Sequence, residues 1–380
     1  MSAVPIDRDR IAQLHREAPL TDIHAHPSLK AYLFRRNLWR HYRSGSTFNP
    51  FSSRSDFRML ARGGVGVVWN ALHLPERELF GCFWLRAAGL LVLPAYAKLV
   101  RGRPFTRLLE MAGAMEREIA RRPAFVELAT TAADVRRIRQ LGKIAVVHTV
   151  EGAHALEGDP GNLDRLADHG VAMLTLSHFF DNGVAEQTRG IPRGHFVSVF
   201  CTYDLGWSRP VPLTDFGKTV LQRLTRLRML VDVTHCTPGA RAAVFQEMDS
   251  SRPVVASHVG VHAVQADPYN LQDDEIRHVA ATGGTVGVIF MTHWLAAGAP
   301  KKGLEAIWRT IEHVHRVTGT FDHVALGTDF DGFTDPPDDV RDASQLGRVT
   351  RLLLERGVPE EDVRKILGGN AQRALERGWR

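Results

Sequence analysis

The chain has 380 residues, 44% of them hydrophobic and 24% charged, which is the composition of a soluble globular protein with a substantial core. Its formal net charge of +6 raises the question of nucleic-acid binding, but the basic residues are scattered and form no recognisable nucleic-acid-binding module. Three cysteines are too few and too dispersed for a disulfide framework or a zinc knuckle.

The N-terminal segment is charged and lacks the apolar core of a signal peptide. Residues 81–100 are apolar, but Arg86, Pro94 and Lys98 interrupt them, and a membrane-spanning helix needs about twenty mostly apolar residues. We therefore expect a buried or surface-docked helix in this segment, no membrane span, and a cytoplasmic protein.

Eight short runs rich in apolar and β-branched residues recur along the chain, and each is followed by polar residues. Near-continuous hydrophobic runs of about four to eight residues are typical of strands in a parallel sheet that is covered on both faces. In chain order, the predicted strands are 21–24, 64–72, 144–148, 171–177, 229–234, 254–257, 285–290 and 324–327.

Segments with helical periodicity lie between these strands, and Thr214 and Asp273 are expected to cap two of them. The stretch 29–56 is expected to be a long loop or a small helical insertion near the mouth of the fold. The predicted helices are 106–122, 132–141, 214–227, 238–248, 273–282, 304–317 and 343–356.

This alternation of strands and helices, without the fingerprint G-x-G-x-x-G after the first strand, favours a barrel over a doubly wound sheet. No internal repeat, low-complexity tract or linker divides the chain. We therefore predict an α/β fold that consists of a single (β/α)8 TIM barrel domain over residues 1–380.

Six of the eight predicted strands are followed by histidine or carboxylate side chains. The carboxyl ends of all strands in such a barrel meet at one face, where active sites are built. One histidine after a strand is more often an ordinary hydrogen-bonded residue than a ligand, but chance would scatter such residues over both faces. The strand-end residues are His24, His26, His148, Glu151, His178, His235, His258, Asp329 and Asp331.

Histidine together with carboxylate is the ligand set of zinc-like divalent metals, and a pair of such metals can activate water for hydrolysis. A protein carboxylate must bridge two metals to offset their repulsion. Glu151 suits this role because Gly152 beside it leaves room, and Asp329 is placed to shuttle a proton to a leaving amine. The pattern therefore predicts a metal site at the C-terminal face of the barrel.

An ordered series of short motifs runs from Asp22 to about Leu375. Each motif is weak alone, but their order is highly specific, and through them the chain resembles the membrane (renal) dipeptidase family of metal-dependent, amidohydrolase-like hydrolases. The motifs are D-I-H-A-H-P at 22–27, E-G-A-H-A-L at 151–156, L-T-L-S-H at 174–178, L-T-D-F-G-K at 213–218, V-D-V-T-H at 231–235, P-V-V-A-S-H at 253–258, N-L-Q-D-D-E at 270–275, G-T-D-F-D-G at 327–332 and G-G-N at 368–370.

The resemblance implies one or two divalent metal ions, with zinc as the expected metal and Glu151 shared between the two positions. His178 would bind the substrate carbonyl and stabilise the oxyanion, and Asp329 would be the general acid/base. Trp69 would line the substrate pocket, and the resemblance also implies a homodimer. The implied metal ligands are His24, His26, Glu151, His235 and His258.

Two positions depart from the family pattern. His26 replaces an Asp, which removes one negative charge and leaves open whether one or two metals bind. His24-Ala-His26 also looks like the His-x-His strand of the amidohydrolase superfamily. However, we find no lysine on the fourth strand that could serve as the carbamate bridge between metals in that superfamily. Tyr269 replaces an Arg that grips the substrate carboxylate, and it cannot make a bidentate, charge-assisted pair. Tyr269 is then either a weaker substrate contact or a packing residue, and Arg189 is a candidate replacement for the lost Arg.

Among the other histidines, we expect His73 to be an ordinary loop residue, His148 to face the barrel interior behind Glu151, and His154 to orient a metal ligand. The sequence thus predicts a metal-dependent hydrolase that cleaves the amide bond of a dipeptide or small peptide-like substrate. Two alternatives remain. One is a diverged barrel that acts on another amide or lactam metabolite or serves as a non-catalytic binding module; the other is a nucleic-acid-associated protein, which only the net charge suggests.

Overall fold

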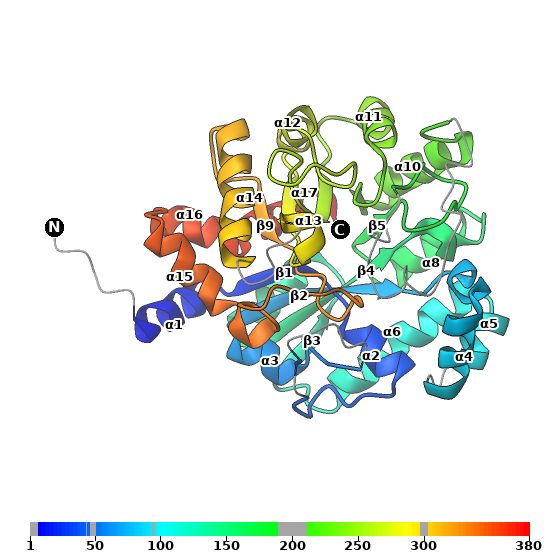
Figure 1. The fold of residues 1–380 in the computed structure, drawn as a ribbon, viewed down its shortest axis with the longest axis horizontal. Helices are drawn as coiled ribbons and strands as arrows, with labels where there is room; N and C mark the ends of the chain where they lie inside the picture. Colours follow the sequence, from blue (N-terminus) through cyan, green and yellow to red (C-terminus); the bar gives the residue numbers. More distant parts are fainter. Residues whose placement is uncertain (1–6, 43, 46–50, 93–95, 189–210, 297–302) are drawn as a thin grey trace.

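The computed structural model describes residues 7–42, 44–45, 51–92, 96–188, 211–296 and 303–380 (Figure 1). All eight predicted strands are present: β1 (Leu20–Ala25), β2 (Val65–His73), β4 (Ile144–Glu151), β5 (Met173–Thr175), β6 (Leu230–Asp232), β7 (Val254–Val259), β8 (Thr285–Val288) and β9 (Val324–Leu326). Neighbouring strands pair in the order β2-β1-β9-β8-β7-β6-β5-β4, and β2 also pairs with β4, which closes the ring. All of these pairings are parallel, so the predicted (β/α)8 barrel is confirmed.

One further strand, β3 (Val126–Ala129), was not predicted and lies outside the closed ring. It pairs with the first four residues of β4, whereas β5 pairs with the last three. The last residue of β4, Glu151, is therefore held between two ring strands, opposite His73 of β2 and Thr175 of β5. This register places the Glu151 side chain at the C-terminal mouth of the barrel.

The predicted helices are found close to their expected bounds, except that 343–356 divides into the 3-10 turn η4 (Ala343–Gln345) and α15. Thr214 caps α10 as predicted, because its side chain accepts a hydrogen bond from the amide of Gly217. Asp273 is instead the first residue of α12, and Gln272 caps that helix. These helices are α6 (Pro104–Ala120), α7 (Ala132–Gln140), α10 (Asp215–Leu227), α11 (Pro238–Glu247), α12 (Asp273–Ala281), α14 (Gly303–Thr318) and α15 (Gly347–Glu355).

Other helices complete the layer around the barrel (Figure 1). The stretch 29–56, expected to be a loop or a small helical insertion, contains the end of α2, and its other described residues form no helix or strand. The additional helices are α1 (Arg8–Glu17), α2 (Pro27–Leu33), α3 (Phe57–Arg62), η1 (Arg77–Gly81), α4 (Phe83–Val92), α5 (Tyr96–Arg101), η2 (Ala153–Leu156), α8 (Asn162–Asp168), α13 (Thr292–Ala296), α16 (Glu360–Arg364), η5 (Lys365–Gly369) and α17 (Asn370–Gly378).

The apolar segment 81–100 forms the two short helices α4 and α5 at the edge of the molecule (Figure 1). α4 lies on the surface and exposes several large apolar side chains. Within the described residues, no helix is long and apolar enough to cross a membrane. The exposed side chains on α4 are Phe83, Trp84, Leu90 and Leu91.

The interior of the barrel is filled by apolar side chains from alternate positions of the strands, as expected for a packed rather than hollow barrel. An apolar cluster lies below the mouth, so the polar side chains at the strand ends are above a mostly apolar floor. The buried members of this cluster include Ile23, Val67, Trp69, Ala145, Val147, Met173, Leu230, Val255 and Ala325.

Candidate active site

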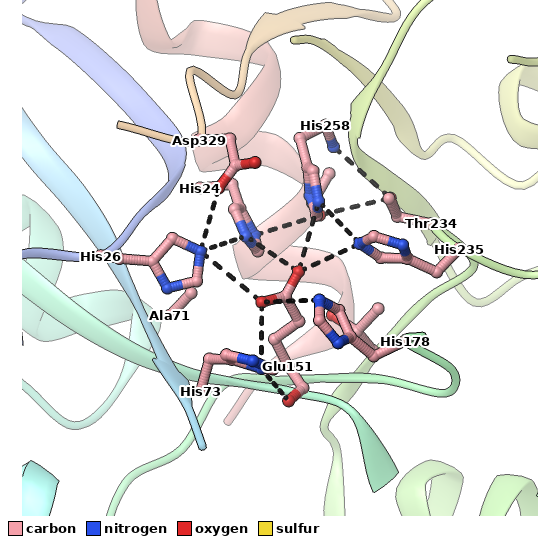
Figure 2. A network of polar contacts seen from close by, with 12 residues as sticks. His24, His26, Ala71, His73, Glu151, His178, Thr234, His235, His258 and Asp329 are labelled. Carbon is pink, nitrogen blue, oxygen red and sulfur yellow. Dashed lines mark hydrogen bonds and ion pairs between the residues drawn. The ribbon is translucent and has the colours of Figure 1, made fainter. Parts of the chain in front are cut away.

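Four imidazole rings and one carboxylate converge at the mouth of the barrel (Figure 2). They come from four different strands or from the residues that follow them. The first and the last of them, His24 and His258, are more than two hundred positions apart in the chain. All five are buried, so the structure brings together the complete metal-ligand set predicted from the sequence. These residues are His24, His26, Glu151, His235 and His258.

Glu151 lies at the centre of this group. Its Oε1 lies 3.4 Å from Nε2 of His24, 3.2 Å from Nε2 of His235 and 3.3 Å from Nε2 of His258. Its Oε2 faces His26, whose Nε2 is 3.6 Å away. One carboxylate is therefore shared by two pairs of imidazoles, as the bridging role requires.

The two imidazole pairs have the spacing of ligands to a common ion. Nε2 of His24 and Nε2 of His26 are 3.1 Å apart, and Nε2 of His235 and Nε2 of His258 are 3.2 Å apart. Two ligands at about 2.0–2.1 Å from a tetrahedral metal are separated by about 3.3 Å. The residues present therefore fit two divalent ions, one held by each pair together with Glu151.

Ser257 sets the protonation of two of these rings. Its hydroxyl donates to Oδ2 of Asp232 at 2.5 Å, so it can only accept from Nδ1 of His258 at 2.8 Å and Nδ1 of His24 at 3.3 Å. Both rings then carry a proton on Nδ1, and their Nε2 atoms face the cluster. This is the usual way in which hydrogen-bonded partners orient metal-binding histidines.

The electrostatics of the cluster favour a bound cation. Burial alone would raise the pKa of Glu151, but His178, His24 and His235 hold it well below its ordinary value, so the carboxylate is ionised. Burial opposes protonation of His24, yet Glu151 outweighs it and raises the pKa of His24 to about 9. Burial lowers the pKa of His258, which keeps that ring neutral and able to donate a lone pair.

Asp329 lies at the edge of this centre, with its Oδ1 3.1 Å from Nε2 of His26. Its backbone has a positive φ of 57° and its amide donates to the carbonyl of His24, which turns the side chain toward the mouth. Asp331 instead accepts hydrogen bonds from Ser55 and from the amide of Arg54. These contacts give Asp331 a supporting role rather than a place among the metal ligands.

His178 faces the same cluster from the loop after β5. Its Nε2 lies 4.0 Å from Oε2 of Glu151, and its Nδ1 donates to Oε1 of Glu76 at 2.6 Å. Burial would raise the pKa of Glu76, but His178, His154 and His73 hold it far below its ordinary value. Glu76 is therefore an ionised carboxylate within the site that sequence reasoning missed.

His73 is the second residue that sequence reasoning missed, and its interpretation as an ordinary loop residue is wrong. It is the last residue of β2, and its Nδ1 donates to the carbonyl of Glu151 at 3.2 Å. The signal was available: His73 lies four positions after Trp69, and residues an even number apart share one face of a strand. Glu76 follows the strand in a loop and carried no such signal.

Tyr269 is placed differently from its predicted substrate contact. It is fully buried, its hydroxyl donates to the carbonyl of His258 at 2.6 Å, and its ring stacks on Trp294 at 3.8 Å. This is the packing alternative, because the hydroxyl is already engaged. Trp69 is likewise fully buried among the apolar residues of the barrel floor. Neither position supports a contact with substrate. Arg189, the candidate replacement for the lost Arg, lies outside the described residues.

The other two histidines also differ from expectation. His148 accepts a hydrogen bond from Asn70, and its Nε2 lies 3.9 Å from Glu116 of α6. It therefore faces the helix layer rather than the barrel interior, because it is an odd number of positions from Glu151 on one strand. His154 donates to the carbonyl of Leu74 at 2.9 Å, a backbone contact rather than the contact with a metal ligand that we expected.

Comparisons with known proteins agree with this geometry. The family described as membrane dipeptidase (peptidase family M19) matches residues 8–378. The "uncharacterized protein in pqqA 5'region" of Klebsiella pneumoniae is 30% identical over 74% of this chain and 99% of its own. Dipeptidase verJ of Clonostachys rogersoniana is 27% identical over 85% of this chain and 76% of its own.

A solved structure has the same fold. It is a metallo peptidase from Rhodobacter sphaeroides liganded with a phosphinate mimic of the dipeptide L-Ala-D-Ala. It covers 95% of this chain and 99% of its own, with a TM-score of 0.76 at 22% identity. Because the family match spans nearly the whole chain, this protein belongs to the membrane dipeptidase family and is an enzyme of the metallo-dipeptidase type.

Proposed function

We propose that the protein hydrolyses the amide bond of a dipeptide or small peptide-like molecule, with zinc as the metal. The observation that carries this proposal is the convergence of four imidazole Nε2 atoms on the single carboxylate of Glu151. His24, His26 and Glu151 would hold one ion, and Glu151, His235 and His258 the other. When bound, such ions polarise a carbonyl and lower the pKa of water.

The protein's own residues would supply the remaining steps. Asp329 would take a proton from the attacking water and pass it to the leaving amine, a transfer that requires a carboxylate at the edge of the centre. His178 would donate a hydrogen bond from Nε2 to the carbonyl oxygen as negative charge develops there. The apolar floor of the barrel would exclude other water from the reacting atoms.

We further propose that the preferred substrate lacks an ordinary free carboxylate. The Tyr269 hydroxyl is engaged with a backbone carbonyl, so it is not available to a substrate. The nearby guanidinium of Arg241 is also engaged, with Glu275 and with the carbonyls of residues 268 and 269. Of these two described residues, neither is therefore available to a substrate carboxylate, and an amidated or cyclised C-terminus would need neither group.

The test is an activity assay of zinc-loaded protein on free dipeptides, C-terminally amidated dipeptides and small lactams. Amidated substrates should be cleaved faster than the matching free dipeptides. Glu151→Ala and Asp329→Asn should each lower kcat/KM by at least about 100-fold, the scale of a lost acid/base or metal ligand. Glu355→Ala, which removes an exposed carboxylate from α15, should match the wild type.

Each outcome has a defined meaning. If the loaded wild type cleaved none of these amides, the proposed reaction would be wrong and the binding-module alternative would replace it. If free dipeptides were cleaved faster than amidated ones, the proposed substrate class would be wrong while the reaction stood. Full activity of Asp329→Asn would remove Asp329 from its proposed role.

A further inference from the structure

A second polar cluster adjoins the metal centre but belongs to neither proposed ligand set. It consists of His73 at the end of β2, Glu76 just before η1, and His178 after β5. All three side chains are buried. Figure 2 shows His73 and His178 on the same side of Glu151, away from His24 and His258.

Glu76 holds the segment that carries His178 at two points. Its Oε1 accepts from Nδ1 of His178 at 2.6 Å and from the backbone amide of Phe179 at 3.0 Å. The ring of His178 also packs against two others, with centroid distances of 3.8 Å to the ring of Phe179 and 4.2 Å to the ring of His73. These contacts fix both the position of the backbone and the rotation of the imidazole.

The hydrogen bond to Glu76 also decides which nitrogen of His178 faces Glu151. An ionised carboxylate can only accept, so Nδ1 carries a hydrogen and points at Glu76. Nε2 on the opposite side of the ring then points toward Glu151, 4.0 Å from its Oε2. Without Glu76, rotation about the side-chain bonds could present either nitrogen to a substrate.

The same cluster could instead be interpreted as a third metal site. The short separation of Oε1 of Glu76 and Nδ1 of His178 opposes this, because 2.6 Å is a hydrogen-bond distance. Two ligands of one tetrahedral ion would be about 3.3 Å apart. The geometry thus assigns Glu76 to His178 rather than to an ion.

We propose that Glu76 is the positioning residue of this enzyme, which holds His178 so that its Nε2 is presented to the substrate carbonyl. The substrate part of this inference rests on the proposed function, whereas the orientation of the ring does not. Glu76 acts through His178 and touches no reacting atom. Partners of this kind typically contribute about 10–100-fold to affinity or activity.

A double-mutant cycle tests whether Glu76 acts through His178. Glu76→Ala should lower kcat/KM by about 10–100-fold, mainly in kcat, with the metal content unchanged. In the His178→Ala background, the same substitution should cost less than about twofold. Glu76→Gln keeps an acceptor and should recover much of the loss, and Glu78→Gln, which removes an exposed carboxylate of η1, should have no effect.

Two results of the cycle would overturn the proposal. One is a full loss from Glu76→Ala in the His178→Ala background, which would mean that Glu76 acts independently. The other is a loss of bound metal in Glu76→Ala, which would make it a ligand. Should Glu76→Ala fail to fold, Glu76→Asp, with its carboxylate one methylene further back, takes its place in the cycle.

A second measurement keeps this inference separate from the proposed function. Proton–nitrogen NMR of the histidine side chains should show a protonated Nδ1 for His178, identified by its absence in His178→Ala. That signal should be lost in Glu76→Ala and kept in Glu76→Gln and Glu78→Gln. Its persistence in Glu76→Ala would refute the positioning role even if no substrate were cleaved, whereas an inactive wild type would refute only the proposed reaction.

Discussion

His26 is the residue at which this site departs most from the family pattern, and its surroundings explain how an imidazole can serve there. Its Nε2 lies between two carboxylates, 3.6 Å from Oε2 of Glu151 and 3.1 Å from Oδ1 of Asp329. A neutral ring brings a lone pair but no negative charge. Glu76 adds a buried, ionised carboxylate on another side of the cluster, but its charge is paired with His178 and does not replace the charge lost at position 26.

Ser257 orients two of the proposed metal ligands, so its removal should weaken zinc binding. Ser257→Ala removes the acceptor for Nδ1 of His24 and His258, so both rings can rotate or change tautomer. The affinity for zinc should fall by about 10–100-fold, as for other partners of metal-binding histidines. Competition with a chelator of known affinity measures this directly. Ser251→Ala, at an exposed position far from the site, serves as the control, and equal affinities of both variants would contradict the account.

Individual residues were predicted from the sequence to different degrees. The metal ligands were predictable because each follows a recognisable strand, and strand ends in a barrel share one face. Glu76 was not, because a loop residue carries no periodic signal and its partner His178 lies 102 positions away. The sequence left Tyr269 as either a substrate contact or a packing residue, and only the structure shows that its hydroxyl is engaged by the backbone.

Among the elements, α11 and α12 and the loop before α12 are joined by one side chain. Arg241 of α11 is fully buried. Its guanidinium forms an ion pair with Glu275 of α12 at 2.6 Å. It also donates hydrogen bonds to the carbonyls of residues 236, 268 and 269. The loop that it holds carries Tyr269, which packs on His235 at 5.1 Å between ring centroids. The helix layer thus supports a metal ligand.

Arg241→Met should therefore destabilise the protein by about 3–5 kcal/mol, since it leaves Glu275 buried without its partner. Adding Glu275→Gln should return part of this loss, because the second substitution removes the unpaired charge. Urea unfolding of the three proteins measures the free energy of unfolding. Arg226→Met, at an exposed position of α10, should change it by less than about 0.5 kcal/mol. A similarly small effect of Arg241→Met would be inconsistent with this interpretation.

Most elements were predictable because their patterns are long and regular. The eight ring strands are near-continuous apolar runs, and helices such as α10 and α14 show clear periodicity. β3 was missed because it has four residues, two of them only partly buried. Asp273 was taken as a cap because its type favours that position, but Gln272 and Glu275 form a capping box one residue earlier.

At the scale of the whole molecule, barrel closure creates the site. The ligands extend from His24 to His258, and only the pairing of β2 with β4 and of β1 with β9 brings them around Glu151. The carboxyl ends of the eight ring strands meet at one face, so seven of them, all except β8, can contribute polar side chains to one cluster. A metal bound there links several strands and should stabilise the folded chain against unfolding.

The most direct test of the central claim is the number of zinc ions bound per chain, measured by elemental analysis after dialysis of the zinc-loaded protein. We expect two ions in the wild type and fewer than one in Glu151→Ala, because both proposed positions share this carboxylate. Glu355→Ala should retain two. A wild type that binds no zinc, or a Glu151→Ala variant that retains both ions, would show that Glu151 does not bridge two metal positions.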